Sequence, residues 1–188
     1  MASRSSQWCR KLLAGFIRQP FARDDRAAVS VEFAILALPF FAVLGAILET
    51  SLVFLATNIL DSAVNDASRQ IRTGQAQAAA FNTTKFEKLV CDRLYGMFKD
   101  CSGLYSSVTI VNDFKSATAV APVQQSCTSS CTWTRPEDFS PGTGSNIVMV
   151  QVYYRWPLIL SIGGFDLANM ADHSRLLGSV RVFRNEPF

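Results

Sequence analysis

The sequence predicts an α+β fold, with a long N-terminal helix followed by a short helix and a small antiparallel sheet of about three strands. Three observations lead to this prediction. An apolar stretch begins near residue 29 and carries no charge from Phe33 to Leu48. Apolar residues then recur at spacings of three and four as far as Ile71, which is typical of an amphipathic helix. Beyond residue 103 the apolar period becomes two, which is typical of strands.

The first part of the long helix is apolar enough to cross a membrane. As a helix, its uncharged core would be roughly 24 Å long, and apolar neighbours on both sides extend it toward the thickness of a hydrocarbon layer, about 30 Å. We therefore assign residues 28–57 to a transmembrane helix, residues 58–74 to an amphipathic extension of that helix, and residues 75–188 to a small outer domain. An acid at the leading edge, Glu32, disfavours a cleavable signal peptide.

The charge distribution predicts which way the helix lies in the membrane. Residues 1–27, which we interpret as a basic cytoplasmic leader, hold six basic residues and two acidic ones, whereas the rest of the chain holds twelve and thirteen. Short segments rich in Lys and Arg remain on the cytoplasmic side, so the outer domain is expected on the opposite side. Because the outer domain has no basic patch in its sequence, nucleic acid is not an expected partner.

Two glutamates of the long helix stand in or beside the apolar stretch. Glu32 lies within its leading edge, and an acid carried to the bilayer centre costs on the order of 2–3 kcal/mol. Glu32 therefore either reaches back to the cytoplasmic interface or has a partner, and the residues alone leave both readings open. Glu49 lies where the helix would leave the bilayer, and we expect it at the membrane–water interface.

The cysteines predict two disulfides in the outer domain. Cys9 belongs to the leader, whereas Cys91, Cys101, Cys127 and Cys131 lie beyond the apolar stretch. An even number on an oxidising side allows three pairings. The first choice is Cys127 with Cys131, which leaves Cys91 with Cys101 and requires the chain to reverse between them, since a straight helix would hold them about 15 Å apart. The alternative, a zinc site, lacks the paired CxxC spacing, so no metal is expected.

The outer domain is expected to contain one helix and three strands. A Thr84-x-x-Glu87 capping box begins a helix that runs to about Lys99. Alternation and β-branched residues predict strands at 105–114, 146–156 and 173–184. Residues 115–145 are rich in Ser, Thr, Pro and Gly and are interpreted as an exposed loop.

Motifs for catalysis are missing from the sequence. There is no GxSxG and no glycine-rich phosphate loop. His173 is the only histidine, and we expect it at the surface or at a strand end rather than in an acid–base pair. We therefore predict no catalytic residue and no cofactor, which makes a membrane-tethered hydrolase the weakest of the function classes considered.

The N-terminal run resembles the TadE-like proteins, the minor pilins (pseudopilins) of the tight-adherence type IVb pilus. In that family a basic leader precedes a small residue, four further residues, a glutamate and an aromatic residue. Here these are Ala27, Ala28-Val-Ser-Val31, Glu32 and Phe33. Three further runs are similar to the family, namely Asn58-Ile-Leu-Asp61, Ala67-Ser-Arg-Gln-Ile-Arg-Thr-Gly74 and Asn185-Glu-Pro187.

The resemblance implies a processing site and a role for Glu32. A prepilin peptidase of the bacterial inner membrane would cut between Ala27 and Ala28, making Glu32 the fifth residue after the cut and the residue that sets subunit register. Its carboxylate would neutralise the new α-ammonium of Ala28 on a neighbouring subunit, and a buried pair of this kind specifies register more than it adds stability. The family favours glycine before the cut, where this chain has Ala27, so a retained leader is the alternative.

The function that the resemblance implies is that of a minor pilin with a periplasmic domain, acting in assembly or at the tip of an adhesive pilus by helix packing and without catalysis. Its partners would be the inner membrane, other pilin and pseudopilin subunits, the prepilin peptidase and the pilus assembly platform. The alternative is a signal-anchored periplasmic binding or adhesion module that never enters a fibre.

Overall fold

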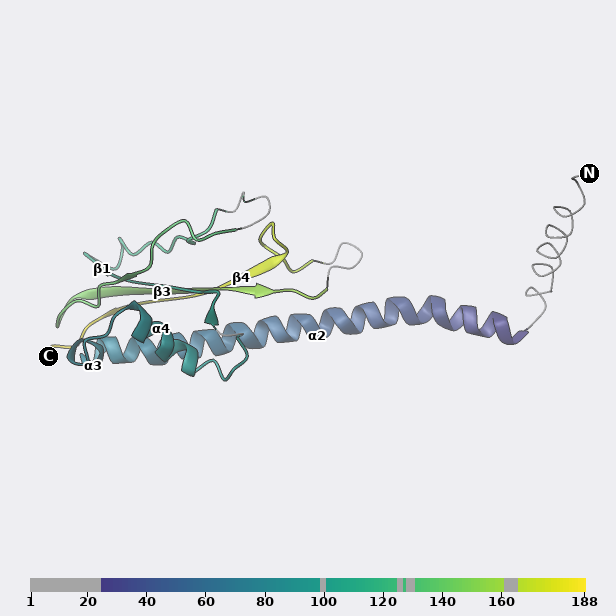
Figure 1. The fold of residues 1–188 in the computed structure, drawn as a ribbon, viewed down its shortest axis with the longest axis horizontal. Coiled ribbons are helices and arrows are strands. Elements are labelled where there is room, and N and C mark those ends of the chain that lie inside the picture. Colours follow the sequence, from purple (N-terminus) through teal and green to yellow (C-terminus); the bar gives the residue numbers. More distant parts are fainter. Residues whose placement is uncertain (1–24, 99–100, 125–126, 128–130, 161–165) are drawn as a thin grey trace, which may run out of the picture. The chain divides into compact units, whose positions relative to one another are not determined.

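The computed structural model describes residues 25–98, 101–124, 127, 131–160 and 166–188, so most of the leader lies outside the described residues. The chain divides into two compact units, Met1–Gly45 and Ala46–Phe188, which are considered separately. Its elements are, in order, α2 (Asp25–Arg72), α3 (Gln75–Ala78), α4 (Thr83–Asp92), β1 (Leu104–Val111), β2 (Asp138–Phe139), β3 (Ile147–Pro157) and β4 (Ser174–Arg184) (Figure 1). The predicted α+β class is confirmed.

The long helix α2 follows from its sequence. Its apolar first part contains no glycine before Gly45, and Arg69 and Arg72 lie in its last turn, where cations interact favourably with the helix dipole. The helix ends before Gly74, which has a φ of +79°, a left-handed conformation that favours glycine. A Cβ at Gly74 would lie 2.7 Å from the ring of Phe188, so close packing also favours glycine there.

From Glu49 onward, one face of α2 packs against the rest of the unit Ala46–Phe188, which we call the outer unit. The buried positions recur at intervals of four and three residues, which places them on one stripe of the helix. They are Glu49, Val53, Ala56, Leu60, Ala63, Val64, Ala67, Ser68 and Ile71. The apolar members of this stripe form one core cluster with α4 and with one face of the sheet.

The sheet has four strands in the order β2-β1-β3-β4. β3 is central and pairs antiparallel with β1, from Leu104 opposite Tyr154 to Val111 opposite Ile147, and antiparallel with β4 along its whole length. The expected three-stranded antiparallel sheet is therefore incomplete, because β2 adds a short edge strand that runs parallel to β1. β2 is only two residues long, so it leaves no alternation in the sequence to detect.

Both faces of β3 are buried, the second of them by a few residues of the segment 115–145. The other described residues of that segment are mostly exposed, as expected of a loop. Val148, Val150 and Val152 face the helices, whereas the alternate residues face the chain that precedes β3 (Figure 1). On that second face the ring of Trp133 lies 5.2 Å from that of Tyr105, and the guanidinium of Arg155 lies 5.0 Å from the Trp133 ring. Side chains from part of this loop thus cover the second face of the sheet.

The second helix is shorter than predicted and begins at a different cap. The side chain of Asn82, not that of Thr84, is the N-cap, and it accepts a hydrogen bond from the N–H of Lys85 at 2.9 Å. Helix α4 ends at Asp92 instead of Lys99, because Tyr95 and Gly96 adopt left-handed conformations that turn the chain. The one-turn helix α3, in what was expected to be a plain connector, was not predicted.

The turn after α4 brings the first cysteine pair together. Cys91 and Cys101 are joined with their Cα atoms 6.1 Å apart, and Cys127 and Cys131 with theirs 5.3 Å apart. Both pairs predicted from the sequence therefore lie at disulfide distance. The reversal that the first pair requires is supplied by the early end of α4.

Candidate functional site

The candidate site is the apolar part of α2, where side chains are exposed all around the helix. From Val29 to Leu44 the large apolar residues expose between 40 and 73% of their surface. The segment has a mean hydropathy of 2.4, and no part of its most apolar window is buried in the protein. The helix is therefore long and apolar enough to span a membrane, and the structure shows no cover for it among the described residues.

Glu32 is the one charged residue between Val29 and Leu48. It lies in α2 and is exposed, as is Phe33 beside it. Ala27 and Ala28 also belong to α2, so Glu32 follows Ala28 by four residues on one continuous helix. Since residues four apart share a face of a helix, the register acid and the residue expected to carry a new α-ammonium would lie on the same side of the apolar segment.

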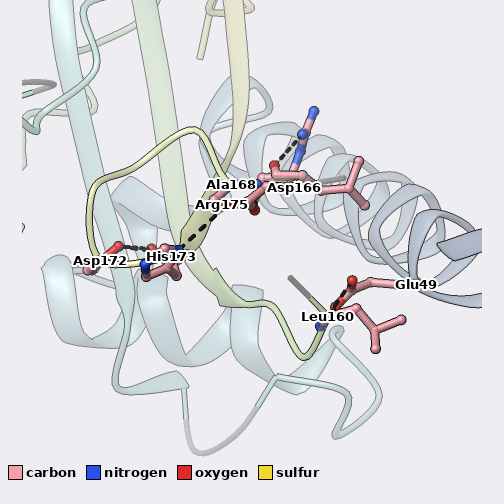
Figure 2. A network of polar contacts seen from close by, with 9 residues as sticks. Glu49, Leu160, Asp166, Ala168, Asp172, His173 and Arg175 are labelled. Atoms are coloured by element: carbon pink, nitrogen blue, oxygen red, sulfur yellow. Dashed lines mark hydrogen bonds and ion pairs between the residues drawn. The ribbon is translucent and has the colours of Figure 1, made fainter. Parts of the chain in front are cut away.

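Glu49 has a partner that the sequence did not reveal. Its side chain is only 6% exposed, and its carboxylate accepts hydrogen bonds from the backbone N–H groups of Ile159, at 2.6 Å, and Leu160, at 3.1 Å. Figure 2 shows this contact, which joins α2 to the segment that follows β3 (Figure 2). Glu49 therefore ties α2 to the segment that follows β3, with its carboxylate directed at these amides rather than exposed.

Asp61 makes the second polar tie between α2 and the sheet. Its carboxylate accepts a hydrogen bond from the hydroxyl of Ser179 at 2.7 Å and one from the guanidinium of Arg181 at 2.5 Å, both in β4. Further along the helix, Asp66 pairs with Arg93, which follows α4. Acids that sequence periodicity assigns only to a polar face are therefore used to fix the helix against the rest of the domain.

The end of the chain closes over the end of α2. The backbone N–H of Glu186 donates to the carbonyl of Arg72 at 2.9 Å, and the buried side chain of Asn185 donates to the carbonyls of Pro141 and Thr143. Of the runs that carry part of the family resemblance, 185–187 thus contacts the end of 67–74, and 58–61 contacts β4 through Asp61. Their contacts are those of a structural seam that attaches the sheet to the helix.

One carboxylate of the outer domain titrates unusually. Burial, together with the nearby charge of Glu137, raises the pKa of Glu87 from 4.5 to about 7. A hydrogen bond from the hydroxyl of Ser106, at 3.1 Å, opposes the shift. Glu87 therefore does not act as the second half of a capping box but faces β1 and the edge of the sheet.

Within the described ranges, no three His, Cys, Asp or Glu side chains are close enough to hold a metal ion. The ring of His173 is 77% exposed and its Nδ1 lies 3.5 Å from the carboxylate of Asp166 (Figure 2). A groove of about 470 Å³ runs beside α2 and β4. Its lining residues are Asn65, Asp66, Ser68, Arg69, Arg72, Arg181, Val182 and Phe183.

Comparison with protein families gives a match at the N-terminal helix. The family model described as TadE-like protein matches residues 27–69. This segment is TadE-like. The match begins at the residue before the expected cut, includes Glu32 and Phe33, and extends along the half of α2 that packs on the sheet. It confirms the resemblance and associates the chain with pilus-related proteins.

The TadE-like segment is less than a quarter of the chain. No curated protein and no solved structure matches the chain. The outer domain beyond residue 69 is therefore described by its own geometry, in which α4 and the four-stranded sheet pack on the TadE-like helix.

Proposed function

We propose that the protein is a minor pilin, or pseudopilin, of a tight-adherence (type IVb) pilus, anchored by α2 in the bacterial inner membrane with its outer domain in the periplasm. One observation carries the proposal: the part of α2 from Val29 to Leu48 is apolar, is exposed on all sides, bears Glu32 as its single acid and lies within the segment that matches the TadE-like model. Such a helix needs either lipid or neighbouring helices around it. A subunit that leaves the membrane for a fibre exchanges contact with lipid for contact with neighbouring helices.

Glu32 gives this exchange a register. In lipid the carboxylate is unfavourable away from the interface, and in a fibre it would be surrounded by apolar helices. Pairing with the α-ammonium of Ala28 on a neighbouring subunit would offset the cost of burying both charges, and only one stagger of the helices brings the two groups together. The charge pair selects that stagger, while the apolar side chains from Phe33 onward supply the contact area.

Processing by a prepilin peptidase, between Ala27 and Ala28, is part of the proposal, because the α-ammonium exists only after the cut. The outer domain contributes contacts with other subunits and with the assembly platform, and no catalysis by this chain is involved. The second candidate is a signal-anchored periplasmic adhesion module, which is favoured by one observation, namely that Ala27 stands where the family favours glycine.

Replacing Glu32 tests the proposal. We expect Glu32→Ala to abolish piliation in the cell that makes the fibre while the membrane level of the protein holds, because Glu32 belongs to the unit Met1–Gly45 and not to the unit that holds the folded core. The measurements are electron microscopy of sheared fibres and immunoblots of membrane fractions. Asp92→Ala, which removes an exposed acid at the end of α4, is the matched control and should leave piliation intact.

Wild-type piliation by the Glu32→Ala variant would overturn the role in register and favour the adhesion module. Mass spectrometry of the protein recovered from membranes checks the processing step independently. A mature N-terminus at Ala28 is the expected result, and an intact leader in a piliated cell would contradict the proposed charge pair.

A further inference from the structure

Between Ile47 and Ala56, α2 is buried on one side and exposes apolar side chains on its other sides. On one side Glu49, Val53 and Ala56 are buried against the outer domain. On its remaining sides the helix still exposes large apolar side chains, which are Ile47 at 56%, Leu48 at 65%, Leu52 at 46%, Phe54 at 71% and Leu55 at 46%. Thr50 and Ser51 are exposed at this level as well, and their hydroxyls donate to carbonyls of the same helix. From Asn58 to Arg72 every exposed position is polar.

Because the buried and the exposed apolar residues occupy the same turns of α2, the outer domain begins before the exposed apolar surface of the helix ends. Glu49 and Leu55 are six residues apart, about 9 Å along a helix, and the exposed apolar surface extends at least as far as Leu55. A bilayer places about 5–8 Å of headgroup region on each side of its hydrocarbon. If α2 spans the membrane to the point where its exposed surface becomes polar, then Glu49 and whatever it binds lie inside the boundary.

What Glu49 binds is the segment that follows β3. Its carboxylate accepts the N–H groups of Ile159 and Leu160, so this segment is held at the level of Glu49 (Figure 2). Ile159 exposes 86% of its surface, the highest value of any large apolar residue in the described part of the chain together with that of Tyr95. An Ile side chain exposed to this extent in water forgoes most of the favourable free energy that burying its apolar surface would supply.

We propose that Ile159 inserts into the outer interface of the membrane that α2 spans, so that the outer domain rests directly on the lipid. The rim of the domain, defined as Ile159 with the helix residues Ile47, Leu48, Leu52 and Leu55, is then in contact with lipid. The backbone N–H groups at Ile159 and Leu160 are already paired with Glu49, so they do not need water at that depth. The proposal rests on α2 spanning a membrane and does not require a fibre.

Continuity with the apolar helix favours lipid over a protein partner at this rim. From Phe33 to Leu55 no exposed position of α2 is charged, and the hydroxyls of Thr50 and Ser51 are bonded within the helix. Ile159 is fixed at a level within that surface. Burying one isolated side chain is too little area for a specific protein interface, whereas insertion of a single apolar side chain beside an existing span needs no complementary pocket.

Site-directed spin labelling of the full chain tests the insertion. In a Cys9→Ser background the other four cysteines are paired, so Ile159→Cys gives a single labelling site. The labelled protein is reconstituted into vesicles of phosphatidylcholine and phosphatidylglycerol. Accessibility of the nitroxide to oxygen, which concentrates in lipid, is compared with accessibility to a water-soluble nickel chelate by power-saturation electron paramagnetic resonance.

Phe114→Cys is the matched control, because Phe114 is also apolar and is 55% exposed. It follows the end of β1 that pairs with the start of β3, whereas Ile159 follows the end of β3. We expect the nickel accessibility at position 159 to be several-fold lower than at position 114, with the oxygen accessibility higher. Equal nickel accessibility at the two positions would overturn the proposal. Spin–spin broadening at position 159 that disappears on dilution with unlabelled protein would also overturn it, because the rim would then contact a second copy of the chain.

Discussion

The carboxylate of Glu49 accepts a hydrogen bond from the backbone N–H of Ile159 at 2.6 Å, across a sequence separation of 110 residues. An acid near the end of the apolar part of α2 thereby accepts hydrogen bonds from two partly buried amides just beyond the end of the sheet's central strand. This contact is the first point at which α2 and the outer domain are joined, and it decides the level at which the domain begins.

Replacing Glu49 by Ala should destabilise the outer domain by about 1–3 kcal/mol, because two partly buried N–H groups lose a charged acceptor. Glu49→Gln keeps one acceptor oxygen and should cost less. Thermal unfolding in detergent micelles, followed by tryptophan fluorescence, measures both. Thr50→Ala is the control, since the Thr50 hydroxyl bonds only to its own helix. Equal stability of the Ala variant and the control would show that the pairing contributes nothing.

Gly74 should be intolerant of a side chain for two separable reasons. Gly74→Ala puts a Cβ on a residue with a φ of +79° and within 2.7 Å of the Phe188 ring. Gly96→Ala has the same backbone problem, with a φ of +69°, but no atom within 4 Å of the new Cβ. Both variants should lose about 1–2 kcal/mol through backbone strain, and the additional loss in Gly74→Ala measures the contact with Phe188. If the two losses are equal, the Phe188 ring moves aside for the new Cβ without lowering the free energy of unfolding.

The raised pKa of Glu87 predicts a pH dependence of stability with a definite sign. In the folded protein the carboxyl has a pKa of about 7, against 4.5 when unfolded, so the folded state holds its proton more tightly. The stabilisation is fully present below pH 4.5 and is lost as the pH rises to about 7. Since the side chain is only partly buried, the effect should be of order 1–2 kcal/mol.

Comparison of the wild type with Glu87→Gln isolates this term, because the amide does not titrate and other carboxylates contribute equally to both proteins. Unfolding free energies at pH 5 and pH 8 should diverge, with the Gln variant relatively more stable at pH 8. Parallel pH profiles for the two proteins would place the pKa of Glu87 near its ordinary value.

The two disulfides should contribute unequally. Loop-closure entropy predicts about 3 kcal/mol for the bond that closes the ten-residue separation between Cys91 and Cys101, and about 2 kcal/mol for the four-residue separation between Cys127 and Cys131. Double Cys→Ser variants of each pair, unfolded in denaturant, measure the difference. A larger loss at the second pair would mean that Cys131, which is fully buried beneath Trp133, matters through packing.

Local patterns predicted the parts of this fold that depend on neighbours in sequence. Helix α2 has a long apolar run and then a periodic stripe, and β3 is rich in β-branched and aromatic residues, so both were found with nearly correct bounds. Asn82 and Thr84 are equally good caps by residue type. Only the packing of Phe86 and Val90 against the sheet determines which of the two begins the helix.

Contacts between distant segments could not be predicted. β2 is two residues long and exists only because β1 lies beside it, and the loop before β3 covers the sheet through single residues such as Trp133. In the candidate site the family pattern was enough to single out Glu32 and Phe33. Glu49 was visible as an acid in an apolar setting, but its partners are backbone amides, which carry no mark in a sequence.

The hydrogen bond from the N–H of Glu186 to the carbonyl of Arg72 has a consequence for the order of folding. The carboxyl end of α2 is closed by residues that are synthesised more than a hundred positions later, and β4, which carries Ser179 and Arg181 to Asp61, is also late. If the chain is exported as it is translated, α2 waits in the bilayer with its stripe uncovered until residues 174–188 have crossed. A chaperone at the exit of the translocation channel would therefore meet this protein first as a bare helix.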